Sequence, residues 1–147
     1  MEVHMKKNVL ILTGSPRRGG NSDLMAEAFA RGALSKGHSV DVFHAGRARI
    51  AGCVSCRTCW KTGRACSVRD GFSDLEPLLE RADALALATP LYWFGMSAQI
   101  KAAVDRMLCY LEPACPRPLR IFASAFLICG ADGEPGIFDG AIATYRL

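Results

Sequence analysis

The chain has 147 residues, of which 50% are hydrophobic and 22% charged, with a formal net charge of +4. This length suits a single domain over residues 1–147, and the composition is ordinary for a globular protein. The scattered positive charge argues against a nucleic-acid binder, which usually carries a dense basic stripe. Its apolar runs are shorter than the ~20 residues of a membrane helix, and its start lacks a signal-peptide pattern. We therefore expect a cytoplasmic protein without a membrane partner.

The first part of the chain alternates strand and helix patterns. An apolar run at 8–13 predicts a strand that is buried on both faces. Apolar residues at helical spacing then predict a helix over 22–36. Asn21 or Ser22 could cap the start of this helix, and Gly37 could end it.

The middle of the chain holds a second strand pattern and then a long irregular segment. Residues 39–44 alternate between apolar and polar side chains, as a half-buried strand does. Residues 45–72 contain four cysteines and four glycines without regular periodicity. Because connections of this length in compact domains are usually functional or disordered, we treat 45–72 as a cysteine-rich insertion.

The second part of the chain alternates in the same way. Ser73 and Glu76 have the spacing of a capping box, and Ser97 could cap a later helix. The predicted elements are a helix over 73–81, a strand over 84–89, a helix over 97–111, a strand over 119–129 and a helix from about 137. Strands and helices in this order predict the α/β class, with a doubly wound parallel sheet between two layers of helices.

The loop GSPRRGGNS at 14–22 connects the first strand to the first helix. Ligands of open parallel sheets bind beyond the carboxyl ends of the strands, where this loop would lie. Its glycines, hydroxyl groups and two arginines precede a helix N-terminus, a combination that favours a phosphate group. The loop matches neither the P-loop nor the dinucleotide fingerprint. An ordinary turn into a capped helix is the alternative.

The loop PLYWFGMS at 90–97 follows the third strand and contains three consecutive aromatic residues. Flat apolar side chains at the ligand edge of a sheet suit the stacking of a ring system. A hydrophobic plug or a dimer contact would use the same residues. A phosphate loop and an aromatic wall together indicate a ligand with a phosphate at one end and a flat ring at the other, as in FMN.

These motifs resemble those of the NADPH-dependent FMN reductases, a family of flavodoxin-like proteins, and most closely its iron–sulfur flavoprotein type. The resemblance rests on 14–22, on the cysteines of 53–66 and on TPLYWFGMSAQIKAAVDR at 89–106. It implies a flavodoxin-like fold with FMN as cofactor and NAD(P)H as co-substrate. Electrons would pass to a quinone, flavin, nitroaromatic or similar small-molecule acceptor. It also implies a homodimer or higher homo-oligomer.

The resemblance further implies which residues hold FMN, with its phosphate on the first loop and its ring beside the later loops. The cofactor-binding candidates are Ser15, Arg17, Arg18, Gly20, Asn21, Ser22, Pro90, Leu91, Tyr92, Trp93, Phe94, Gly95, Gly130, Ala131 and Asp132. Because FMN carries the chemistry, no catalytic side chain is expected. Relatives usually continue through a fifth strand and a final helix. This chain ends at Leu147, so we expect a truncated form or a sheet that lacks the last strand and helix.

Four of the seven cysteines follow the spacing C-x2-C-x2-C-x6-C. The candidate metal ligands are Cys53, Cys56, Cys59 and Cys66. Four thiolates are the usual ligand set of a [4Fe–4S] cluster, which would make the chain an electron carrier. A structural zinc ion is a weaker alternative, because its two CxxC pairs are usually farther apart. The remaining alternative is that these four thiols are reduced and bind no metal. The other cysteines fit small buried hydrophobes: Cys109, Cys115 and Cys129.

Overall fold

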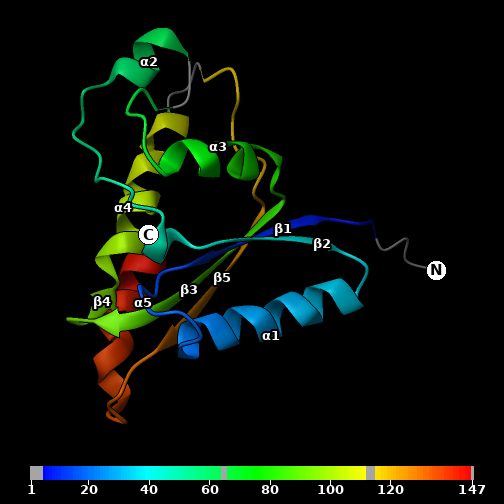
Figure 1. Ribbon diagram of the computed structural model, residues 1–147, viewed down its shortest axis with the longest axis vertical. Coiled ribbons are helices and arrows are strands. Elements are labelled where there is room, and N and C mark those ends of the chain that lie inside the picture. Colours follow the sequence, from blue (N-terminus) through cyan, green and yellow to red (C-terminus); the bar gives the residue numbers. More distant parts are fainter. Residues whose placement is uncertain (1–4, 64–65, 112–114, 147) are drawn as a thin grey trace.

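A parallel sheet in the order β2-β1-β3-β5 forms the centre of the computed structural model, which describes residues 5–63, 66–111 and 115–146 (Figure 1). A short strand, β4, pairs antiparallel with the end of β3. The strands are β1 (Asn8–Thr13), β2 (Ser39–Phe43), β3 (Ala84–Tyr92), β4 (Gly95–Met96) and β5 (Ala123–Cys129). In register, Val9 pairs with Val40 on one side and with Ala84 on the other. The carboxyl ends of the four parallel strands therefore lie at one edge.

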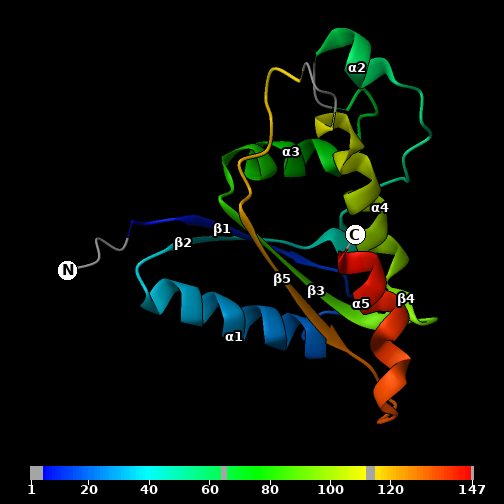
Figure 2. The same ribbon diagram turned by 180° about the vertical axis from the view of Figure 1, so that it is seen from behind.

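Helices cover both faces of this sheet, as Figures 1 and 2 show from opposite sides. α1 lies on one face, and α3 and α4 lie on the other. The helices are α1 (Asn21–Ser35), α2 (Thr58–Thr62), α3 (Phe72–Arg81), α4 (Ala98–Arg106) and α5 (Asp139–Arg146). Three short 3-10 turns are η1 (Ala45–Arg47), η2 (Met107–Tyr110) and η3 (Pro135–Phe138). The predicted α/β class with three layers is confirmed.

The core is divided by the sheet because successive side chains of a strand point to opposite faces. Val9 and Ile11 of β1 pack on the α1 side, together with Ala26 of the helix. Leu10 and Leu12 point to the other face and join the large cluster under α3 and α4. Each fully buried leucine of this kind contributes about 2 kcal/mol to the stability of the fold. An apolar strand buried on both faces, as predicted for 8–13, is what this two-sided packing requires.

The structure corrects two predicted helix starts. Neither Asn21 nor Ser22 caps α1, because the N-cap position is Gly20, which offers no side-chain bond. The predicted capping box at Ser73 is also wrong, because the N-cap of α3 is Gly71. There, the Asp70 carboxylate accepts the Phe72 backbone N–H at 2.9 Å and takes over the role of the cap. The start at Ser97 is confirmed, since its hydroxyl accepts the Ile100 N–H at 3.4 Å.

Several predicted bounds also differ from the structure. The segment 45–72 is not wholly irregular, because it contains η1 and α2. The helix predicted over 97–111 leaves α geometry at Arg106 and continues as η2. The last strand begins at 123 rather than 119, and the final helix at 139 follows a 3-10 turn. Among the described residues, β5 pairs with β3 alone, which leaves one edge of β5 unpaired.

The third strand is longer than predicted and ends in a hairpin. Leu91 pairs with Met96, and Tyr92 pairs with Gly95. The two turn residues between them, Trp93 and Phe94, have positive φ angles of 48° and 62°. Two-residue hairpin turns with positive φ usually carry Asn and Gly, so an aromatic pair gave no sequence signal for this turn.

Candidate functional site

An open cleft of about 530 Å³ lies at the carboxyl edge of the sheet, where the loops after β1 and β5 meet the end of β3. Its size falls within the range of small-molecule sites. The cleft is lined by Ser15, Arg17, Arg18, Gly19, Gly20, Asn21, Ser22, Pro90, Leu91, Tyr92, Cys129, Gly130 and Ala131. The structure therefore brings together residues from all three loops that the sequence singled out.

Four of the predicted cofactor-binding residues do not line this cleft: Trp93, Phe94, Gly95 and Asp132. Trp93 lies at the tip of the hairpin and is 93% exposed. The antiparallel pairing of β3 with β4 turns the chain back after Tyr92, which carries the hairpin tip beyond the cleft lining. The aromatic run is thus divided between a cleft residue and an exposed tip.

The N-terminus of α1 opens into the phosphate-loop side of the cleft. Its N-cap, Gly20, makes no side-chain hydrogen bond, so the first-turn N–H groups have no side-chain partner there. The Gly19 N–H donates to the Asp23 carboxylate at 2.9 Å, and the Arg17 N–H donates to the Ser15 hydroxyl at 3.2 Å. These local bonds hold the loop 15–20 in a curved conformation around the helix start.

Arg47 of η1 supports this loop from outside the cleft, a role that the sequence did not reveal. Its guanidinium donates to the Asp23 carboxylate at 3.2 Å and to the carbonyl oxygens of Ser15 and Arg17. η1 packs so closely that a Cβ on Gly46 would lie 2.2 Å from the Ser15 carbonyl oxygen. Only glycine fits at that position, so a glycine three residues after the end of β2 was the available signal.

Cys129 lies in the cleft lining instead of in the core where the sequence placed it. It is half-buried, and its sulfur lies 3.6 Å from the Ser22 hydroxyl oxygen. Its position as the last residue of a strand, directly before Gly130, was the signal that placed it at the ligand edge. Cys109, by contrast, is buried as predicted, and burial raises the pKa of its thiol to about 12.

The residues of the cleft fit FMN in their chemistry. The uncapped helix start and the arginines provide N–H donors and positive charge for a phosphate. Pro90, Leu91 and Tyr92 provide an apolar wall, and Gly130 faces it. A Cβ on Gly130 would lie 3.3 Å from the Leu91 side chain. A side chain at Gly130 would therefore press on the apolar wall.

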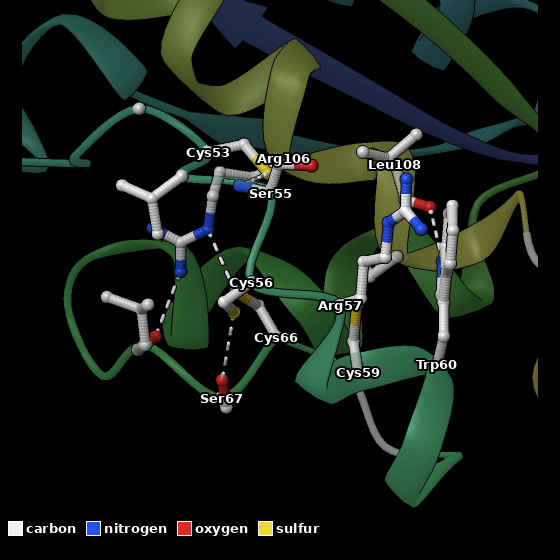
Figure 3. Close-up of a pocket in the computed structure, with 14 residues that line it drawn as sticks. Cys53, Ser55, Cys56, Arg57, Cys59, Trp60, Cys66, Ser67, Arg106 and Leu108 are labelled. Atoms are coloured by element: carbon white, nitrogen blue, oxygen red, sulfur yellow. Dashed lines mark hydrogen bonds between the residues drawn. The ribbon is translucent and has the colours of Figure 1, made fainter.

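The four clustered cysteines line a second, small cavity of about 20 Å³, which lies apart from the cleft beside α2 and η2. Figure 3 shows Cys53, Cys56, Cys59 and Cys66 around it, with Trp60 and Arg106. The Trp60 indole N–H donates to the Leu108 carbonyl at 3.2 Å and so attaches α2 to η2. All four cysteines therefore line one cavity.

The environments of these thiols differ. The Ser55 N–H donates to the Cys53 sulfur at 3.4 Å. Hydrogen bonds from Thr58 lower the pKa of the exposed Cys56 thiol, whereas burial raises the pKa of Cys59. Within the described parts of the chain, no three Cys, His, Asp or Glu side chains are close enough together to hold a metal ion. The donor set thus suits a thiophilic metal, but its sulfurs are not gathered.

Comparisons with known proteins agree with this architecture. A family model described as NADPH-dependent FMN reductase matches residues 7–134. An iron–sulfur flavoprotein of Archaeoglobus fulgidus is 37% identical over 99 residues, which are 67% of this chain and 44% of that protein. An iron–sulfur flavoprotein of Methanocaldococcus jannaschii is 28% identical over 113 residues, which are 77% of this chain and 53% of that protein. The chain thus spans about half the length of these curated relatives.

A solved structure extends the agreement to the fold. The NAD(P)H:quinone oxidoreductase from Methanothermobacter marburgensis matches with a TM-score of 0.75 over 97% of this chain and 75% of that chain. Its sequence identity of 24% supports the shared fold alone. No helix in the described residues is both long and apolar enough to cross a membrane. The family model covers most of the chain, so the predicted resemblance is confirmed and the chain belongs to the NADPH-dependent FMN reductase family.

Proposed function

We propose that this chain binds FMN in the cleft and acts as a flavin oxidoreductase, taking hydride from NAD(P)H and reducing a quinone, flavin, nitroaromatic or similar acceptor. The observation that carries the proposal is the composition of one cleft. A basic, glycine-rich helix start and an apolar strand end face the same space. A ligand with an anionic end and a flat ring complements both halves.

The phosphate end of FMN is assigned to the loop before α1. The backbone N–H groups of the first helical turn would donate to the phosphate, and the dipole of this helix would add to their effect. Arg17 and Arg18 would supply charge, while Asn21 and Ser22 would add side-chain donors. Arg47 acts indirectly, because it holds the loop rather than lining the cleft.

The ring end is assigned to the space between Pro90–Tyr92 and Gly130–Ala131. Bound FMN supplies the hydride acceptor, and the protein supplies orientation and shape. Four candidates adjoin the lining residues in sequence but do not line the cleft: Trp93, Phe94, Gly95 and Asp132. The exposed side chains of Trp93 and Phe94 support contact with a second subunit, which makes a homodimer part of the proposal.

FMN binding and turnover test this proposal directly. The purified chain should take up about one FMN per chain, with quenched flavin fluorescence, and should oxidise NADH or NADPH when a quinone is added. Light scattering would report the oligomeric state in the same preparation. A chain that folds but takes up no FMN would overturn the proposal.

A second candidate function is electron transfer through a [4Fe–4S] cluster held by Cys53, Cys56, Cys59 and Cys66. Two observations favour it over unliganded thiols: the four cysteines border one cavity, and N–H groups already donate to the sulfurs of Cys53 and Cys66. Such hydrogen bonds tune clusters in proteins. A cluster, when bound, supplies a one-electron centre. Zinc is the weaker alternative.

Metal analysis separates these alternatives. Protein purified without oxygen should contain iron and acid-labile sulfide near four of each per chain if the cluster is present. Zinc without sulfide would favour the structural ion, and neither metal would leave the flavin function standing alone. Because all seven cysteines are free, a reducing, cytoplasmic compartment is the setting that we propose.

A further inference from the structure

Arg106, the last residue of α4, carries a guanidinium that the FMN cleft does not use. Its side chain is only 1% exposed, and it is the largest fully buried side chain of the described residues. Burying a cation is costly unless its donors are paired. Figure 3 shows this guanidinium beside the cysteine cavity, and Arg106 does not line the FMN cleft. The buried guanidinium of Arg106 must therefore have its donors paired with neighbouring acceptors.

Among the described residues, the hydrogen-bond partners of the guanidinium all belong to the cysteine loop, which we define as residues 51–70. One terminal nitrogen donates to the Ala51 carbonyl at 3.0 Å and to the Asp70 carboxylate at 3.0 Å. The other donates to the Val68 carbonyl at 2.9 Å. The Asp70 carboxylate also accepts the Ala51 N–H at 2.9 Å. Arg106 and Asp70 thus join the two ends of the cysteine loop to each other and to α4.

The remaining donor reaches a candidate ligand. The Nε of Arg106 donates to the Cys66 sulfur at 3.1 Å. The guanidinium also lies over the Phe72 ring, 4.8 Å from its centroid, which fixes its plane. The partners of Cys53 and Cys56 are residues of the loop itself, Ser55 and Ser67, and both thiols are exposed. Cys59 and Cys66 both pack against the main core cluster, but Cys66 is the one whose sulfur accepts a hydrogen bond from a core helix.

We propose that Arg106 is the positioning residue of the cysteine site: it closes the cysteine loop against α4 and fixes the Cys66 sulfur as the anchored ligand of a thiophilic metal centre. The inference deepens the second candidate function and rests on it for the class of ligand. Binding would require the exposed Cys53 and Cys56 to move toward Cys66, because the sulfurs are not gathered. The anchored sulfur supplies the fixed point for that movement.

The geometry requires the forked guanidinium and not only its charge. Three donor directions serve two backbone carbonyls and one sulfur at the same time. A lysine ammonium is a single point with three donors at the end of a flexible chain, so it cannot span these groups together. The conservative substitution therefore separates a positioning role from a purely electrostatic one.

Cobalt(II) is a suitable probe, because thiolate ligation gives it intense near-ultraviolet charge-transfer bands and visible bands of tetrahedral geometry. Oxygen-free protein would be titrated with Co(II) as wild type, Arg106→Met, Arg106→Lys and Cys66→Ser. Arg117→Met is the matched control, because Arg117 pairs with Glu80 at the surface. FMN uptake by each variant would report that the flavin cleft and the fold are intact.

We expect Arg106→Met to weaken Co(II) binding about 10- to 100-fold, the usual effect of losing an outer partner of a ligand, and to lower the thiolate band toward that of Cys66→Ser. Arg106→Lys should not restore either, and Arg117→Met should match wild type. Full recovery with lysine, or an unchanged spectrum in Arg106→Met with normal FMN uptake, would overturn the inference.

Three further outcomes also bear on the inference. If both Arg106 variants fail to fold, wild type and Cys66→Ser can still be compared. The thiolate–cobalt band should be weaker in Cys66→Ser than in wild type, and an equal band would overturn the role of Cys66 as the anchored ligand. A wild type without any thiolate–cobalt band would overturn the inference and leave FMN binding untouched. If the protein is isolated without iron or sulfide but binds cobalt through thiolates, the cluster function is contradicted and the positioning role of Arg106 stands.

Discussion

The Ser97 hydroxyl donates a hydrogen bond to the Gly14 carbonyl oxygen at 2.7 Å, across 83 residues of sequence. The Ser97 hydroxyl oxygen in turn accepts the Ile100 N–H at 3.4 Å, and the Ser97 N–H donates to the Thr89 hydroxyl at 3.0 Å. All of these groups are buried. One serine thus caps α4 and holds the start of the phosphate loop beside the end of β3. The two loops of the proposed FMN site are coupled through it.

Ser97→Ala should therefore destabilise the protein by about 2 kcal/mol, because it removes a helix cap and leaves the buried Gly14 carbonyl without its partner. Thermal unfolding followed by circular dichroism would measure the loss. Ser35→Ala is the matched control, since Ser35 is exposed and bonds only to the Gly32 carbonyl. It should change stability by less than about 0.5 kcal/mol. Equal effects of the two substitutions would contradict the coupling.

Arg17→Ala should weaken FMN binding by roughly 1.5–3 kcal/mol, through the loss of a charge-assisted bond to the phosphate. Fluorescence titration of flavin into the apoprotein would measure the affinity. Arg31→Ala, on α1 but outside the cleft lining, should leave the affinity unchanged. If Arg17→Ala binds FMN as wild type does, Arg17 does not contact the phosphate.

Asp70→Asn should destabilise the protein at neutral pH by about 3 kcal/mol, the range for breaking a buried ion pair from one side. Burial works to raise the pKa of Asp70, but the N–H groups of Ala51 and Phe72 and the Arg106 guanidinium outweigh it. The pKa of Asp70 in the folded state therefore lies below its ordinary value of 3.8.

A carboxyl group with a lowered pKa contributes stability above its unfolded pKa and loses it as the pH falls through the folded value. The difference in melting temperature between wild type and Asp70→Asn should thus be full at pH 7 and shrink below about pH 4. Asp41→Asn removes the surface pair with Arg81 and should cost at most about 1 kcal/mol. A difference that persists unchanged at low pH would argue against the ion pair.

Trp93→Asn should stabilise the hairpin by about 1 kcal/mol, because asparagine tolerates the positive φ that costs a tryptophan about 1–2 kcal/mol. The strained turn is braced by α5, where a Cβ on Gly140 would lie 2.9 Å from the Phe94 carbonyl oxygen. Chemical denaturation would measure the gain. Leu24→Asn, on an exposed helical position, should not stabilise.

Trp93 and Phe94 keep an unfavourable positive φ although they are exposed at the hairpin tip. Backbone strain of this kind usually marks a functional surface. Trp93→Asn should therefore also reduce dimer formation, the proposed role of the tip. If the variant is more stable but its oligomeric state is unchanged, the hairpin tip does not contribute to dimer formation.

Local patterns predicted the elements where backbone and burial decide them. The apolar run at 8–13 became β1, and the helical spacing over 22–36 became α1 within one residue at each end. Helix caps were predicted less well, because the group that caps a helix is the one whose side chain can reach a free N–H of the first turn, and this depends on the local backbone geometry. Asp70 took this role at α3 while Ser73 was left with a buried hydroxyl that has no partner.

By itself, the amino-acid sequence determined the alternation of strands and helices, the phosphate-type loop before α1 and the cysteine spacing, because each depends on neighbours along the chain. The tertiary structure alone decided that Trp93 leaves the cleft, that Cys129 enters it, and that Arg106 reaches Cys66 across 40 residues. Such contacts depend on how β3, β5 and α4 pack against one another. No local pattern encodes which distant donor a buried sulfur or carbonyl will meet.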